Sequence, residues 1–103
     1  MTIKYTGRFK KDLKRYKNDA VKVKALATIV KCLSETGVVP ANYKPHPLHG
    51  NYEGCMECHI LNDFLLIWID EVNDIIKLVR LGSHSDCFKG AFGAVLRVNS
   101  ELF

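Results

Sequence analysis

The chain of 103 residues has little of what marks membrane, exported or disordered proteins. Its longest uninterrupted apolar run, residues 64–69, has only six residues, whereas a transmembrane helix needs about 20. Residues 1–8 form no apolar segment with a small-residue cleavage site, so we do not expect a secretory signal. With 3 prolines, 7 glycines and no internal repeat, the chain does not resemble collagen-like or low-complexity proteins. We therefore expect a cytoplasmic protein that does not enter a membrane.

The composition is that of one folded domain. Hydrophobic residues make up 48% of the chain and charged residues 25%, and a chain of this length builds a single hydrophobic core. In a reducing compartment, cysteines are expected to be free thiols rather than a disulfide framework. The cysteines concerned are Cys32, Cys55, Cys58 and Cys87.

Basic charge is concentrated in the first third of the chain. Residues 1–36 have a formal net charge of +7, whereas residues 37–103 have a net charge of −3. A basic surface of this kind attracts polyanions, either nucleic acid or an acidic protein partner. The alternative is a lysine-rich helix face that contacts only water. Charge alone therefore does not show whether this surface binds a partner.

Apolar spacing predicts a short strand at residues 3–5 and a helix over residues 7–16. The hydroxyl of Thr6 can cap this helix, and apolar residues recur within it at positions i, i+4 and i+7.

A second helix is predicted over residues 20–35, with Asn18 or Asp19 as its cap and Gly37 as its stop. Because a short polar link joins the two helices, we expect them to form an antiparallel hairpin. The predicted apolar stripe of the second helix consists of Val23, Leu26, Ala27, Val30 and Leu33.

The sequence after the second helix predicts a loop followed by three strands. Residues 38–54 are rich in proline, asparagine and glycine and indicate a loop with little regular structure. Three strands follow at about 54–61, 63–70 and 75–81, joined by hairpin-type connections. The middle run is apolar throughout, which is typical of a strand covered on both faces. We therefore predict an α+β fold in which the helical hairpin packs on a small antiparallel β-sheet, and we assign no element to residues 89–103.

All four histidines lie in the second half of the chain, where Asp63 and Arg80 also occur. Cleavage of RNA needs a base for the 2′-hydroxyl proton, a proton donor for the leaving 5′-oxygen and a cation for the charge on phosphorus. Histidine suits the first two roles because its ordinary pKa is about 6.5, and arginine suits the third. An aromatic side chain such as Phe88 or Tyr52 can stack on a base. The composition permits this chemistry without requiring it, since a single histidine is more often a surface or structural residue.

Two other readings of the same residues involve a metal or a haem. The sequence C-x-x-C-H at residues 55–59 matches the haem attachment pattern, but that chemistry belongs to exported chains, and here no signal is expected. Two histidines at 46 and 49 with cysteines 55 and 58 provide zinc-type ligands. Their spacing is shorter than that of zinc fingers, and a strand would point the two cysteines to opposite faces. We therefore expect neither a metal nor another cofactor.

Three ordered motifs carry a resemblance to a known family. They are H-P-L-x-G at residues 46–50, C-H-I-x-x-D at residues 58–63 and G-S-H-x-D-x-F at residues 82–88. Together with the lysine-rich helical hairpin, they make residues 1–88 resemble the YafQ branch of the RelE/ParE toxin superfamily. The resemblance implies a RelE-like fold and a toxin domain over residues 1–88. Residues 89–103 are then a C-terminal extension of unassigned role.

The resemblance implies a bacterial type II toxin: a ribosome-dependent endoribonuclease that cuts messenger RNA and is neutralised by a cognate antitoxin. It implies a proton-transfer pair of His84 and His59, with His46 and Asp63 as positioning or auxiliary groups. Arg80 is then the cation that stabilises the phosphate, and Phe88 the base-stacking residue. The resemblance also implies that the basic residues of the first third of the chain bind ribosomal RNA, the antitoxin or both. The residues assigned to RNA binding are Lys10, Lys11, Lys14, Arg15 and Lys44.

The chain also departs from this branch, and a second function remains open. Phe64 stands where the branch often has tryptophan, and Cys87 stands where it often has leucine. Residues 89–103 extend past the usual end of the family. The alternative is a protein of the same fold that does not cut RNA, either an inactive relative or a ParE-like inhibitor of a protein target. The three histidines at 46, 59 and 84 favour the nuclease, because ParE-like members lack such a set.

Overall fold

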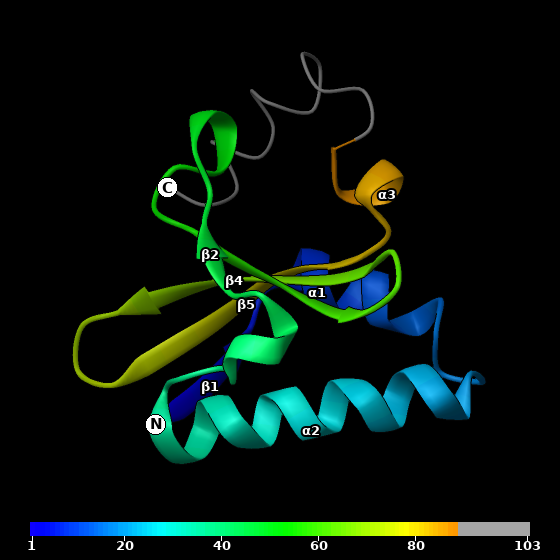
Figure 1. The fold of residues 1–103 in the computed structure, drawn as a ribbon, viewed down its shortest axis with the longest axis horizontal. Coiled ribbons are helices and arrows are strands. Elements are labelled where there is room, and N and C mark those ends of the chain that lie inside the picture. Colours follow the sequence, from blue (N-terminus) through cyan, green and yellow to red (C-terminus); the bar gives the residue numbers. More distant parts are fainter. Residues whose placement is uncertain (89–103) are drawn as a thin grey trace.

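A five-stranded sheet in the order β1-β5-β4-β3-β2 forms the centre of the structure, a computed structural model that describes residues 1–88 (Figure 1). The strands are β1 (Thr2–Tyr5), β2 (His46–Pro47), β3 (Met56–Leu61), β4 (Phe64–Glu71) and β5 (Ile75–Gly82). The predicted antiparallel meander of β3, β4 and β5 is confirmed.

The prediction that the whole sheet is antiparallel is wrong, because β1 pairs with β5 in parallel. Two antiparallel neighbours can be joined by a short hairpin, whereas parallel neighbours need a longer connection. The chain between β1 and β5 includes helices and three other strands, and this connection allows the parallel pairing. The sheet is mixed, and the α+β class of the fold is confirmed.

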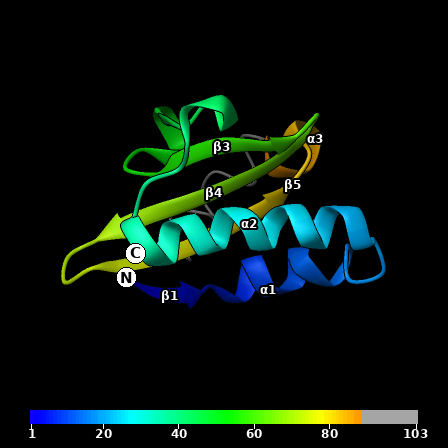
Figure 2. The same cartoon turned by 60° about the horizontal axis from the view of Figure 1, so that its bottom comes forward.

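Helices α1 (Gly7–Lys14) and α2 (Ala20–Thr36) lie side by side on one face of the sheet (Figure 2). Thr6 caps α1 by accepting from the backbone N–H of Phe9 at 3.0 Å, and Asp19 caps α2 in the same way. Gly37 ends α2 with a φ of 73°, a left-handed conformation that glycine adopts without strain. The predicted caps and the stop are thus confirmed, although α1 ends two residues before the predicted 16.

The buried stripe of α2 differs from the predicted one. Leu26, Ile29 and Leu33 are buried, whereas Val23 and Ala27 are exposed. Apolar residues occur around most of the circumference of α2, so periodicity alone fixes the buried side poorly. The side that is buried is the one that contacts β1 and β3.

The loop over residues 38–54 contains short elements that the sequence did not predict. They are two 3-10 turns, η1 (Ala41–Tyr43) and η2 (Gly50–Tyr52), and the strand β2 between them. Strand β2 pairs with β3 and places His46 opposite Glu57. Two residues, one of them a proline without an N–H, are too few to give a strand signal.

The sheet is covered on both faces, and each face has its own apolar cluster. The helix-side cluster includes Phe9, Ile29, Leu33, Leu66 and Leu78. Complete burial of such a side chain stabilises the fold by about 1.5–3 kcal/mol. The opposite cluster consists of Tyr52, Cys55, Ile67, Val79 and Cys87. As predicted, the middle strand β4 is buried on both sides over Phe64–Trp68.

The short helix α3 (His84–Phe88) follows β5 directly and lies on the face opposite α1 and α2. None of the helices within residues 1–88 has both the length and the apolar character needed to cross a membrane. Residues 89–103, to which the sequence analysis assigned no element, lie outside the described residues.

Candidate active site

Alternation along β3 places Glu57 and His59 on the sheet face that carries α3, because Cys58 between them belongs to the helix-side cluster. The Glu57 side chain is only 4% exposed, and its Oε1 lies 3.4 Å from His46 Nε2 and 3.5 Å from His59 Nε2. One buried carboxylate is therefore shared by two imidazoles. His46 Nδ1 lies 2.8 Å from the Lys44 carbonyl oxygen, which favours a proton on Nδ1.

A second carboxylate holds His84. The backbone N–H of His84 donates to Asp63 Oδ1 at 2.9 Å, and His84 Nδ1 lies 2.8 Å from the same oxygen. These two hydrogen bonds, the backbone one first, lower the pKa of Asp63 from its ordinary value. Because Nδ1 faces Asp63, Nε2 of His84 is the nitrogen available to a substrate.

Four rings form a row across the site: His46, His59, His84 and Phe88. The ring centroids are 6.1 Å apart for His46 and His59 and 5.4 Å apart for His59 and His84. Phe88 continues the row with its ring 6.4 Å from that of His84. We call these residues the ring row. All four side chains reach the surface, and neighbouring imidazoles can therefore act on two oxygens of one phosphate group.

Arg80 lies beneath the ring row and not on it. One residue, Val79, is inserted where β5 pairs with β4, and this bulge turns Arg80 to the same face as α3. Its Nε donates to Asp12 Oδ2 at 2.7 Å, and Nη2 donates to the Asp86 carbonyl oxygen at 3.2 Å. Burial opposes the charge, but the hydrogen bonds and charge of Asp12 outweigh it and raise the pKa of Arg80. With 5% of the residue exposed, the guanidinium is a buried charge.

The basic residues expected to bind RNA lie in two places. Lys10, Lys11 and Lys14 are exposed on α1, and Arg15 follows them at 3.7 Å from the carboxylate of Asp86 in α3. The basic side of α1 thus adjoins the helix that carries His84. Lys44 lies elsewhere, two residues before His46, at the other end of the ring row.

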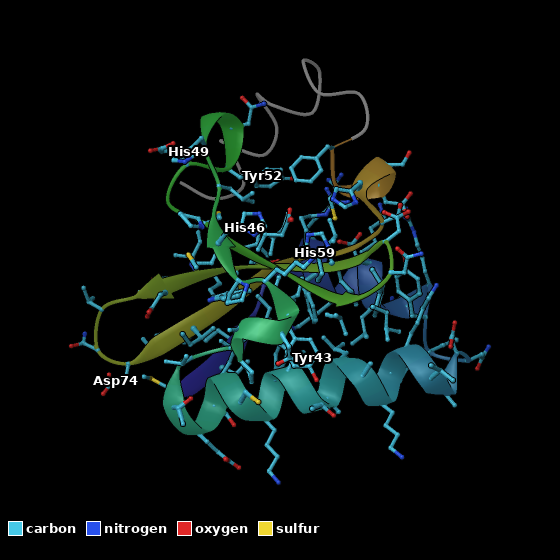
Figure 3. The ribbon with its side chains drawn as sticks, viewed as in Figure 1. Tyr43, His46, His49, Tyr52, His59 and Asp74 are labelled. Carbon is cyan, nitrogen blue, oxygen red and sulfur yellow. The ribbon has the colours of Figure 1, made fainter. Side chains whose placement is uncertain are left out.

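Within the described residues, one group of side chains has ligand atoms close enough together to hold a metal ion. The ligand atoms of Glu57, His59 and His84 lie within 4.8 Å of one another. The zinc arrangement weighed from the sequence is different and does not form. Cys58 is buried on the helix-side face, and the exposed His49 pairs with Glu53 at 3.7 Å (Figure 3). All four cysteines are free thiols, as predicted.

Two residues of the site, Glu57 and Asp12, were missed by sequence reasoning, whereas Tyr52 was considered only as a ring that could stack on a base. Glu57 had a signal, since the spacing Glu-x-His on a strand puts both side chains on one face. Asp12 had no signal, because its partner Arg80 is 68 residues away in sequence. The hydrogen bond from Tyr52 to Cys87, 35 residues away, had no signal either.

Comparisons with known proteins show the family to which the chain belongs. Residues 1–89 match the family model described as the bacterial toxin of type II toxin-antitoxin systems, YafQ. The mRNA interferase toxin YafQ of Escherichia coli K12 is 34% identical over 90 residues, covering 84% of this chain and 94% of that protein. The chain belongs to the YafQ family of bacterial type II toxins.

Solved structures place the fold in the same family. A metal-bound toxin from Helicobacter pylori is 36% identical with a TM-score of 0.75, covering 85% of this chain and 99% of that one. The toxin in an E. coli DinJ-YafQ complex is 31% identical with a TM-score of 0.64, covering 84% and 96%.

Proposed function

We propose that this chain is an mRNA interferase, an endoribonuclease that cuts messenger RNA by acid–base catalysis in the ring row. The observation that carries the proposal is the set of three adjacent imidazoles, two on the buried carboxylate of Glu57 and one on Asp63. Cleavage of RNA needs groups that take up and donate protons, and the E. coli relative is named an mRNA interferase.

The reaction begins with the 2′-hydroxyl of the substrate. His59 takes its proton, and the imidazolium that forms is stabilised by Glu57 at 3.5 Å. The 2′-oxygen bonds to phosphorus while the bond from phosphorus to the 5′-oxygen breaks. His84 donates a proton from Nε2 to the departing 5′-oxygen, and Asp63 stabilises the charged form of His84 before that transfer. The products are a 2′,3′-cyclic phosphate and a 5′-hydroxyl end.

The remaining residues position the substrate. His46 shares Glu57 with His59 and acts as the auxiliary group beside the base. Phe88, 37% exposed at the end of the ring row, stacks on a base next to the cut. Arg80 is the cation assigned to the charge on phosphorus, but it is buried and paired with Asp12 at 2.7 Å, so it acts from a distance and with much of its charge offset.

We also propose the partners of the chain. Lys10, Lys11, Lys14 and Arg15 bind RNA phosphates on the α1 side of the ring row, and Lys44 binds them on the other side. The substrate is messenger RNA on the ribosome, in the cytoplasm. The cognate partner is an antitoxin, as in the E. coli DinJ-YafQ complex. Residues 1–88 form the toxin domain and residues 89–103 an extension, consistent with the family match over residues 1–89.

The chemistry of the cut ends tests this proposal. The chain is added to translating ribosomes with a short mRNA, and the cut site is mapped. A second mRNA carries a 2′-deoxy nucleotide immediately before the cut. We expect 2′,3′-cyclic phosphate ends from the first mRNA and no cut in the second. Cleavage of the 2′-deoxy substrate, or 5′-phosphate products, would contradict the mechanism.

A further inference from the structure

Helix α3 carries two members of the ring row, His84 at its start and Phe88 at its end. A helix of 5 residues is too short to be stable alone, so contacts with the rest of the chain must fix its position. Its start is held by Asp63 and by Ser83, whose hydroxyl accepts from the Asp86 N–H at 3.0 Å.

The end of α3 is held by its carbonyl groups. The Asp86 carbonyl oxygen accepts from Arg80 at 3.2 Å. The Cys87 carbonyl oxygen accepts from the hydroxyl of Tyr52 at 2.8 Å. Tyr52 lies in η2, on the loop that also carries His46, so its hydrogen bond joins two separate parts of the site (Figure 3).

The ring of Tyr52 also contacts Phe88. The two ring centroids are 5.4 Å apart and their planes are perpendicular, the edge-to-face arrangement that aromatic pairs favour. Phe88 is thus held between Tyr52 on one side and His84 on the other. Burial is the main cause that raises the pKa of Tyr52, so its hydroxyl keeps the proton that it donates.

We infer that Tyr52 is a positioning residue of the nuclease: its hydroxyl fixes the last turn of α3 and its ring fixes Phe88, so that Phe88 stacks on the substrate base. This inference rests on the proposed function. Tyr52 is 5% exposed and in contact with Phe88, so it does not touch RNA itself.

Tyr52→Phe tests the inference because it removes one hydroxyl and keeps the ring. We expect Tyr52→Phe to lower the single-turnover cleavage rate about ten-fold, the factor that corresponds to the free energy of one such hydrogen bond. Tyr43→Phe is the matched control. Tyr43 is half-buried against the helix-side cluster, and its hydroxyl makes no hydrogen bond within residues 1–88. We expect this control to cleave at the wild-type rate, with both variants folded by circular dichroism.

A double-mutant cycle with Phe88→Ala separates positioning from general loosening of the fold. The cycle is measured twice, as cleavage rate and as affinity for an uncleavable 2′-deoxy RNA. We expect Tyr52→Phe to weaken both when Phe88 is present, and to change them less than about two-fold when Phe88 is alanine. Equal losses in both backgrounds, or a Tyr52→Phe variant as active as Tyr43→Phe, would overturn the inference. A wild-type chain that cuts no RNA would instead refute the proposed function.

Discussion

Asp12 and Arg80 form a buried ion pair whose removal should be costly. Their side chains are 3% and 6% exposed. The Asp12 carboxylate accepts from Arg80 Nε at 2.7 Å and from Nη2 at 3.4 Å. It also accepts from the backbone N–H of Leu81 at 3.0 Å, on the part of β5 beyond the pairing with β1. Asp12→Ala therefore leaves a buried guanidinium and a buried N–H without these acceptors.

The expected loss is large compared with the stability of a small domain. Removing one partner of a buried pair costs about 3–5 kcal/mol, out of about 5–15 kcal/mol for the unfolding of a typical domain. With a urea dependence of about 2 kcal/mol per molar, the unfolding midpoint falls by about 2 M. The melting temperature falls by at least about 12 °C.

Urea unfolding followed by fluorescence measures this directly, because Trp68 is the single tryptophan and is 3% exposed. Glu35→Ala is the control. Glu35 forms an exposed pair with Lys31 at 3.9 Å, so its loss costs less than about 0.5 kcal/mol. The variant Asp12→Leu with Arg80→Met should recover part of the stability, since it leaves no unpaired charge but still leaves the Leu81 N–H without its acceptor. A loss below about 1 kcal/mol for Asp12→Ala would refute the reasoning that Arg80 depends on Asp12.

Three further predictions concern metals, thiols and RNA. EDTA should leave cleavage unchanged, and Zn²⁺ should inhibit it by binding Glu57, His59 and His84; inactivation by EDTA would contradict this. Burial raises the pKa of Cys55 to about 11 and those of Cys58 and Cys87 to about 12. The stability from these protonated thiols is complete below their unfolded pKa of about 8.5 and decreases as pH rises toward the folded values. The unfolding free energy should therefore fall by about 1 kcal/mol per pH unit per thiol above pH 9. An unfolding free energy that stays unchanged up to pH 11 would contradict the burial of these three thiols. Replacing Lys10, Lys11 and Lys14 by glutamine should weaken RNA binding and reduce its dependence on salt, whereas an unchanged salt dependence would assign these lysines to another partner.

Local signals in the sequence predicted the elements well, and long-range pairing explains what they missed. Thr6, Asp19 and Gly37 act on backbone groups within four residues of themselves, so the helix ends could be predicted from the sequence. The parallel pairing of β1 with β5 joins Thr2 to Ile75, and no local pattern encodes it.

In the site, too, short sequence motifs predicted some residues, and contacts between distant segments determine the others. The motifs predicted that His46, His59, Asp63, His84 and Phe88 belong together, and the structure brings them into one ring row with its supporting carboxylate. Arg80 was expected to stabilise the phosphate, and the structure places it buried against Asp12. Its burial depends on the bulge at Val79 and on Asp12 from α1, two features that arise only when β5 is packed.

Mapping of mRNA cuts in cells tests the central claim most directly. The wild-type chain, His84→Ala and His49→Ala are expressed by induction, and a reporter mRNA is mapped by primer extension while growth is followed. His49 is the control because its side chain is 84% exposed and lies outside the ring row. We predict growth arrest and cuts within the reading frame for wild type and His49→Ala, and neither for a folded His84→Ala. Arrest without cuts, or cuts that persist in His84→Ala, would contradict the account and favour a toxin that acts on a protein target.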